Sequence, residues 1–182
     1  MYLISILGES PGVITEALEW LRKNGVKEEI KQIIIYTKNT KDQATILKKV
    51  LKDKRVLNRI GKVQTKFINI GINDIESEKD LENFEKRVQK ILSNIKGEDI
   101  IVNISGGRKI MVIAILDLIR KLKARKMSWI NIISYLSREK IAELSYSISE
   151  KINAKIKLDD EEIEEYFFSK GNYRVFGKKI DS

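Results

Sequence analysis

The sequence contains no cysteine and no histidine, and only one proline among its 182 residues. Without cysteine there can be no disulfide scaffold, thiol nucleophile, iron–sulfur cluster or cysteine-bound zinc. Without histidine there can be no histidine triad, no histidine general base and no ribonuclease site that pairs arginine with histidine. Any catalysis must therefore use hydroxyl, carboxylate or basic side chains, while a magnesium or manganese site built from oxygen ligands stays open.

Long hydrophobic runs are also missing. The longest apolar stretch, residues 110–119, is interrupted by Asp117 and is too short to cross a bilayer. The apolar start at residues 1–7 is too short for a signal peptide and follows no basic region. With 42% hydrophobic and 34% charged residues, the chain can bury a core. We expect a cytoplasmic protein with no membrane partner.

Positive charge is in excess and is unevenly distributed. The net charge is +9, and residues 105–140 hold nine basic and two acidic side chains, so this fifth of the chain carries +7. Residues 141–169 are acidic instead, with eight acids against three lysines. Such clustering favours a local anion-binding site, although cations at 120–126 would also suit the end of a helix.

Apolar strands and amphipathic helices alternate along the first three quarters of the chain. The strands are apolar on both faces, which is typical of a parallel sheet covered by helices on both sides. We therefore predict an α/β fold: a doubly wound, mostly parallel Rossmann-like sheet with the usual strand order 3-2-1-4-5. The strands are expected at residues 2–7, 31–36, 63–70, 99–104 and 129–136, and the helices at 13–24, 40–54, 77–95 and 109–126.

The regular alternation fades near residue 140. We therefore predict a Rossmann-like domain over residues 1–140 and a small C-terminal strand and helix appendage over 141–182. The appendage is expected to hold edge strands within 141–157, a short acidic helix at 159–168 with Asp159 and Glu162 at its cap, and a basic, aromatic tail.

Two glycine-containing loops each follow a strand and precede a helix. In the predicted strand order the first and fourth strands are neighbours, so both loops should line one crevice at the edge where ligands bind. Glycine amides, helix amino ends, a guanidinium and a hydroxyl all suit phosphate. An ordinary helix start in the first loop and a tight turn in the second stay open as alternatives. The loop residues are Gly8, Glu9, Ser10, Pro11 and Gly12, and Ser105, Gly106, Gly107, Arg108 and Lys109.

A third polar segment, residues 37–41, follows the second strand at the same edge. Thr37 and Asn39 are candidates for contacts with the same ligand. A turn followed by a capping box at Thr40 to Gln43 is the favoured explanation of this segment.

Segment 7–16, LGESPGVITE, together with segment 103–109, NISGGRK, resembles the CRISPR-associated Rossmann fold (CARF) domain. The resemblance covers about residues 1–137. It implies a homodimer that binds a cyclic oligoadenylate made during type III CRISPR defence, the ring lying across the two-fold axis. A short sensor without an effector domain resembles the ring nucleases of this family, which cleave cyclic tetra-adenylate to linear products without a metal or cofactor.

The resemblance also implies residue roles. A serine of the first motif and basic residues of the second match Ser10, Arg108 and Lys109, while Lys170 is a candidate for a C-terminal lysine by position only. The substrate's own 2′-OH would attack the adjacent phosphorus. Two alternatives stay open: a sensor that binds the ring without cutting it and regulates a partner, and a nucleic-acid-binding regulator, for which no reading helix is evident.

Two further features of the sequence lie outside these motifs. Five of the thirteen aromatic residues lie in the last seventeen positions, where they would either form a lid that stacks on adenines or pack an appendage onto the sheet. The nearly all-apolar stretch 110–119 is expected to lie in the core and to reach the dimer interface. The five aromatic residues are Tyr166, Phe167, Phe168, Tyr173 and Phe176.

Overall fold

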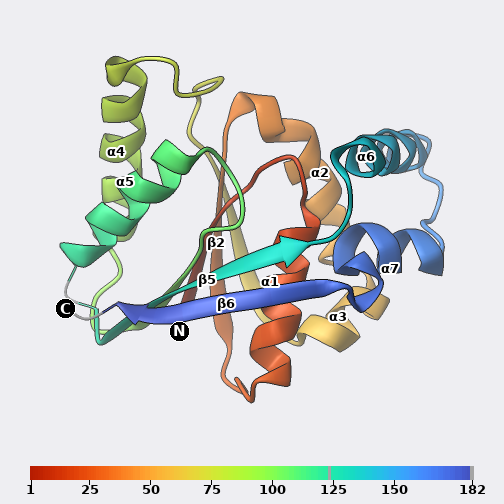
Figure 1. Cartoon of the computed structure of the whole chain (residues 1–182), viewed down its shortest axis with the longest axis horizontal. Coiled ribbons are helices and arrows are strands. Elements are labelled where there is room, and N and C mark those ends of the chain that lie inside the picture. The colour runs from red at the N-terminus through yellow and green to blue at the C-terminus, as the bar shows by residue number, and fades with distance from the viewer. Residues whose placement is uncertain (123, 181–182) are drawn as a thin grey trace.

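A six-stranded sheet forms the centre of the molecule, with helices packed on both of its faces (Figure 1). The computed structural model describes residues 1–122 and 124–180. The elements are β1 (Tyr2–Ile6), α1 (Gly12–Lys23), β2 (Ile30–Tyr36), η1 (Lys38–Thr40), α2 (Lys41–Val50), α3 (Lys54–Ile60), β3 (Val63–Asn69), α4 (Glu78–Leu92), β4 (Asp99–Asn103), α5 (Lys109–Arg120), β5 (Lys126–Ser134), α6 (Arg138–Asn153), α7 (Asp160–Phe168), η2 (Ser169–Gly171) and β6 (Tyr173–Ile180).

The strand order is β3-β2-β1-β4-β5-β6, and the first five strands of this order are parallel. The predicted Rossmann-like fold is therefore confirmed, together with the neighbourhood of β1 and β4. In the register of this pair Ser5 lies beside Asn103. The connection runs outward from β1 to β3 and then returns to β4, so the chain reverses direction across the sheet between β1 and β4, where ligand clefts form.

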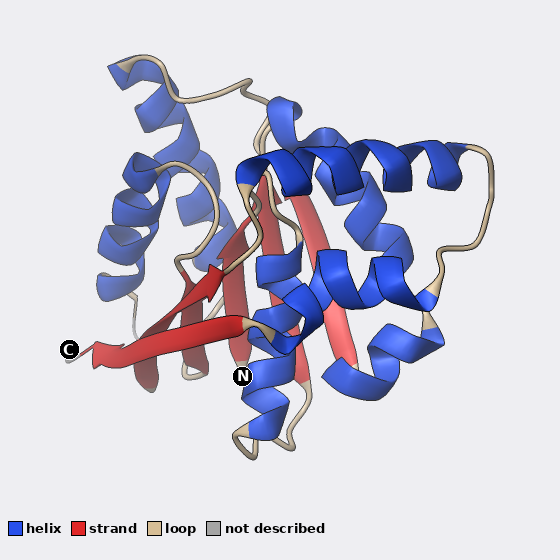
Figure 2. Cartoon of the chain, turned by 45° about the vertical axis from the view of Figure 1, so that its right-hand side comes forward, coloured by secondary structure: helices blue, strands red, loops and turns tan. Residues whose placement is uncertain are grey.

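Two hydrophobic cores lie on either side of the sheet. Figure 2 shows the helices that cover the two faces. The first lies under α1, α2, α3, α6 and α7 and includes Leu3, Ile34 and Phe167. The second lies under α4 and α5 and includes Ile33 and Phe84. No helix in the described part of the chain has the length and apolar character needed to cross a bilayer.

The prediction of edge strands within residues 141–157 is wrong, because residues 141–153 belong to α6 and residues 154–157 form a turn and loop after it. Ser137 caps the helix by accepting a hydrogen bond from the backbone of Lys140, and Leu144, Ile148 and Ile152 are buried. These three apolar side chains are spaced four residues apart, so they form one helical stripe. The serines of this segment alternate with apolar residues, as in a strand, but the residues that are buried follow the spacing of a helix.

The C-terminal residues contribute to the same sheet. β6 pairs antiparallel with β5 over its whole length, from Tyr173 beside Ser134 to Ile180 beside Met127. α7 begins at the predicted capping box of Asp159 and Glu162, and it packs on α1. The division of the chain at residue 140 stays a prediction, although these contacts join both parts. Lys123, a member of the predicted basic segment, and residues 181–182 of the predicted tail lie outside the described residues.

The helix predicted at residues 40–54 ends earlier, and a second helix, α3, which was not predicted, follows it. α2 ends at Val50, and Asp53 caps α3 by accepting a hydrogen bond from the backbone of Arg55. The capping box also lies earlier than predicted: Thr37 and Thr40 form it at η1. A short segment separates α2 from α3, and the predicted helix ran through it.

Candidate functional site

A cleft of about 580 Å³ opens at the edge of the sheet where the parallel strands end. Each of the five parallel strands sends at least one residue into it, from the loop or helix that follows. The predicted crevice between the loops after β1 and β4 therefore exists and is wider than predicted. Its lining consists of Leu7, Gly8, Glu9, Ser10, Val13, Thr37, Asn39, Thr40, Asp74, Ser105, Gly106, Gly107, Arg108, Met111 and Arg138.

The glycines allow the two principal loops to touch. A side chain on Gly8 would place its Cβ 2.9 Å from the backbone nitrogen of Gly107, and one on Gly106 would collide with the carbonyl oxygen of Ile6. Gly107 also has a φ of +76°, a conformation that favours glycine. The tight turn considered from the sequence is thus present, and it brings backbone groups of both loops to one wall of the cleft.

Asn103 fixes the loop after β4, a role that the sequence analysis missed. This buried amide donates to the carbonyl oxygen of Val13 at 3.0 Å and accepts from the backbone nitrogen of Ser105 at 3.1 Å. The Ser105 hydroxyl hydrogen-bonds to Asn103 and accepts from the backbone of Ile132. Asn103 therefore ties β4 to α1, and Ser105 ties β4 to β5. A polar residue at the end of an otherwise apolar strand is the sequence signal that could have identified Asn103.

Among the helices that start at this edge, the amino ends that follow β1, β2 and β4 lack side-chain caps. No side chain caps α1, α2 or α5, whereas Asp53, Ser77, Ser137 and Asp159 cap α3, α4, α6 and α7. The first turns of α1 and α5 also contain no acidic residue. The free backbone N–H groups and the helix dipole make such ends favourable places for an anion.

Ser10 and the third polar segment lie where the sequence predicted them. The half-buried Ser10 lines the cleft, and its hydroxyl makes no hydrogen bond within residues 1–122 and 124–180. Thr37 and Asn39 also line the cleft, although Thr37 takes part in the capping box as well. A ligand entering the cleft would therefore meet a free hydroxyl beside the amino end of α1.

The charges of the cleft are balanced. Its lining has two cations, Arg108 and Arg138, and two carboxylates, Glu9 and Asp74. Arg108 donates from Nε to Asp74 at 2.8 Å, and the Asp74 carboxylate also accepts from the backbone of Ile75. The hydrogen bond from Arg108 lowers the pKa of Asp74, and the same contact raises the pKa of Arg108. The two side chains are therefore both ionised around neutral pH.

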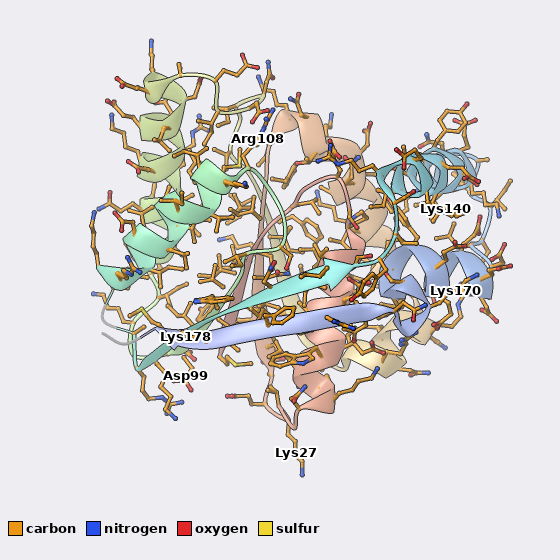
Figure 3. All side chains as sticks on the ribbon, viewed as in Figure 1. Lys27, Asp99, Arg108, Lys140, Lys170 and Lys178 are labelled. Carbon is orange, nitrogen blue, oxygen red and sulfur yellow. The ribbon has the colours of Figure 1, made fainter. Side chains whose placement is uncertain are left out.

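Four predicted site residues do not line the cleft. Pro11 is buried at the start of α1, and Gly12 packs against α7, where a Cβ would meet the Tyr166 carbonyl oxygen. Lys109 is exposed at the first position of α5. Lys170 lies in η2 and pairs with acids of α7, Glu161 at 3.0 Å and Glu165 at 3.7 Å. Figure 3 shows Lys170 well away from Arg108.

Three of the five C-terminal aromatic residues follow the packing alternative and not the lid. Tyr166, Phe167 and Phe168 are fully buried in the core between α7 and α1, as the packing alternative required. Tyr173 is partly buried and donates to Glu19, while Phe176 is 52% exposed on β6. None of the five lines the cleft formed by the described residues.

Asp74 and Arg138 were also missed by the sequence analysis. Asp74 comes from the loop after β3, which carried no motif. Arg138, which was counted in the basic segment 105–140 but given no role in the site, comes from the start of α6. Only the strand order and the position of α6 bring them to the cleft. Within the described residues, no group of three or more acidic side chains is arranged to hold a metal ion.

Two comparisons with known proteins find matches. A family model described as CRISPR-associated protein NE0113 matches residues 10–167. Among solved structures, Enterococcus italicus Csm6 bound to cyclic hexa-2′-fluoro-hexa-dAMP matches with a TM-score of 0.50 and 14% sequence identity. The match covers 99% of this chain but 41% of that one, so the likeness shows a shared fold over part of Csm6. No curated protein sequence matches the chain.

Proposed function

Because the chain belongs to the CRISPR-associated NE0113 family, we propose that its cleft binds a cyclic oligoadenylate in the cytoplasm, with cyclic tetra-adenylate as the ligand. The observation that carries this proposal is the cleft itself, which joins two glycine loops to the uncapped amino ends of α1 and α5. Backbone N–H groups arranged in this way bind phosphate oxygens. Csm6, which shares the fold, is bound to a cyclic hexanucleotide analogue.

The ligand lies across the two-fold axis of a homodimer. Exposed apolar residues at the start of α5 support this arrangement, since Ile110 is 38% and Ile113 is 60% exposed immediately after the second glycine loop. The prediction that α5 lies in the core holds for only part of the helix, because Met111, Ala114, Ile115 and Ile119 are buried while these two are not. An apolar surface beside a ligand cleft suits contact with a second copy.

The bound ring is then cleaved without a metal. The ribose 2′-OH attacks the neighbouring phosphorus, the bond from phosphorus to the 5′ oxygen breaks, and the proton leaves with the 5′-OH, so that a 2′,3′-cyclic phosphate remains. Ser10 orients the 2′-OH or the phosphate, and Arg108 with the amides of Gly106 and Gly107 stabilises the charge on the phosphorane. Because the chain has no histidine to act as a general base, cleavage is slow: general base catalysis typically raises the rate by about 10²–10⁴-fold.

One observation favours a second function, that of a non-cleaving sensor which regulates a partner protein. Of the four candidate catalytic residues, Lys109 and Lys170 do not line the cleft, and Arg108 is engaged with Asp74. A cleft with fewer free cations stabilises a phosphorane less but still binds a ring.

Incubation of the whole protein with cyclic tetra-adenylate and excess EDTA separates the two functions. The cleavage proposal expects linear di-adenylate ending in a 2′,3′-cyclic phosphate, detected by chromatography and mass spectrometry. Stoichiometric binding with no product over hours would reject cleavage and support the function of a non-cleaving sensor. Absence of binding to cyclic tetra- and hexa-adenylate alike would reject both.

The role of Ser10 has its own test. Ser10→Ala removes the free hydroxyl but leaves the backbone amides, so we expect a loss of about tenfold or more in single-turnover cleavage and a change of less than threefold in Kd. Ser149→Ala, on α6 and outside the cleft lining, is the matched control. Equal losses of binding and cleavage in Ser10→Ala would contradict the assignment.

A further inference from the structure

The two arginines of the cleft are in different electrostatic states. Arg108 is paired with Asp74, so its charge is already compensated before any ligand binds. Arg138 forms no ion pair with any residue in the described ranges 1–122 and 124–180. Among the described residues of the lining, Arg138 is therefore the cation outside an ion pair, and Glu9 is the carboxylate outside one.

The stability of α6 does not explain this charge. Arg138 is the first residue of the helix, where a cation opposes the helix dipole. Ser137 already caps the helix, and Glu139 supplies the acidic residue that a first turn favours. The other two cations of α6 are both paired: Lys140 with Glu143 and Glu165, and Lys151 with Asp159 and Glu162.

The position of α6 gives Arg138 a distinct approach to the cleft. α5 packs on one face of the sheet with the second core, and α6 packs on the other face with the first core. Arg108 and Arg138 therefore reach the cleft from opposite faces of the sheet. A ligand that carries several phosphates can contact the amino end of α5 and Arg138 at the same time.

We infer that Arg138 is a phosphate-binding residue of this cleft, and that it supplies the C-terminal cation for which Lys170 was the sequence candidate. Lys170 is unsuited to that role here because Glu161 and Glu165 hold it away from the cleft. The planar guanidinium of Arg138 can bind two oxygens of one phosphodiester. The inference rests on the proposed binding of a cyclic oligoadenylate.

The test measures the Kd of the whole protein for cyclic tetra-adenylate by isothermal titration calorimetry. Arg138→Gln should weaken binding about ten- to a hundredfold, because a charge-assisted hydrogen bond is lost. Lys27→Gln and Lys170→Gln each remove one positive charge outside the cleft and should change Kd less than twofold. Figure 3 shows Lys27 at the opposite end of the molecule from Arg108.

Each outcome of this test has one meaning. If the wild type binds and Arg138→Gln matches the two controls, the inference is overturned and the proposed function stands. If the wild type does not bind, both are overturned. If thermal unfolding shows that Arg138→Gln has lost its fold, Arg138→Lys replaces it: weaker binding supports the two-point contact, and binding equal to that of the wild type overturns it.

Discussion

Glu16 is an ionisable residue buried in the core. It is fully buried on α1, where Ser169 donates to one carboxylate oxygen and the other oxygen has no partner among the described residues. Burial raises the pKa of Glu16 from 4.5 to about 7, with a smaller opposing effect from the Ser169 hydrogen bond and a further increase from the charge of Glu19. The residue is not part of the cleft lining, so its effect should be on stability.

The pH dependence of stability follows from this pKa. Because the folded protein binds this proton more tightly than the unfolded chain, the contribution is fully present below pH 4.5 and is lost as pH rises through about 7. The loss amounts to roughly 3 kcal/mol at most. Glu16→Gln should therefore flatten the fall in urea midpoint between pH 5 and 8. Glu139→Gln, an exposed control whose pKa is lowered, should keep the wild-type slope.

Gly106 tests how closely the two cleft loops must approach. Gly106→Ala would drive a Cβ into the carbonyl oxygen of Ile6, a backbone atom that cannot rotate away, so we expect a loss of about 1–3 kcal/mol or more. Gly25→Ala is the comparison variant: the space around Gly25 is open, so only its φ of +85°, which is unfavourable for alanine, should lower stability there. Differential scanning calorimetry compares the two. A Tm for Gly106→Ala at or above that of Gly25→Ala would contradict the close packing.

At the scale of elements, the sequence predicted the first five strands because apolar or alternating runs mark them. Their order came from the usual arrangement of doubly wound α/β sheets. The prediction was wrong for α6, in which the serines around Tyr146 and Ile148 follow a two-residue period while the buried residues follow a helical one. It placed Ser10 and Arg108 correctly because their loops follow neighbouring strands. The places of Asp74 and Arg138 in the cleft could not be predicted from the sequence, because only the tertiary positions of the loop after β3 and of α6 bring them there.

α5 offers a direct test of the homodimer. Ile113 is 60% exposed on this helix, so Ile113→Asp should leave the fold intact and place a charge in the proposed interface. We expect sedimentation velocity to show a shift from dimer to monomer. Ile156→Asp is the matched control, because Ile156 is 57% exposed in the segment between α6 and α7. If the dimer survives Ile113→Asp, or dissociates equally in the control, this face of α5 is not the dimer interface.

On the scale of the whole molecule, the question is whether residues 141–182 fold separately. Phe167 of α7 is fully buried against the core that contains α1, so Phe167→Ala should cost about 3–5 kcal/mol. In urea we expect tryptophan fluorescence, which reports on Trp20 and Trp129, to shift together with far-UV circular dichroism. Both tryptophans lie before residue 140.

The matched control is Phe176→Ala, which removes the same side chain from a position that is 52% exposed. It should move the urea midpoint much less. A fluorescence transition that stays in place while the dichroism transition moves would instead support a separate C-terminal domain.

The antiparallel return of β6 also matters for labelling the protein. β6 ends beside the first residues of β5, with Ile180 paired to Met127, and Met1 hydrogen-bonds to Lys31 at the start of β2. Both described chain ends therefore lie at the edge of the sheet opposite the cleft. A fluorescent protein fused to either end would leave the cleft open, and attachment to a surface through either end would present the cleft to the solution.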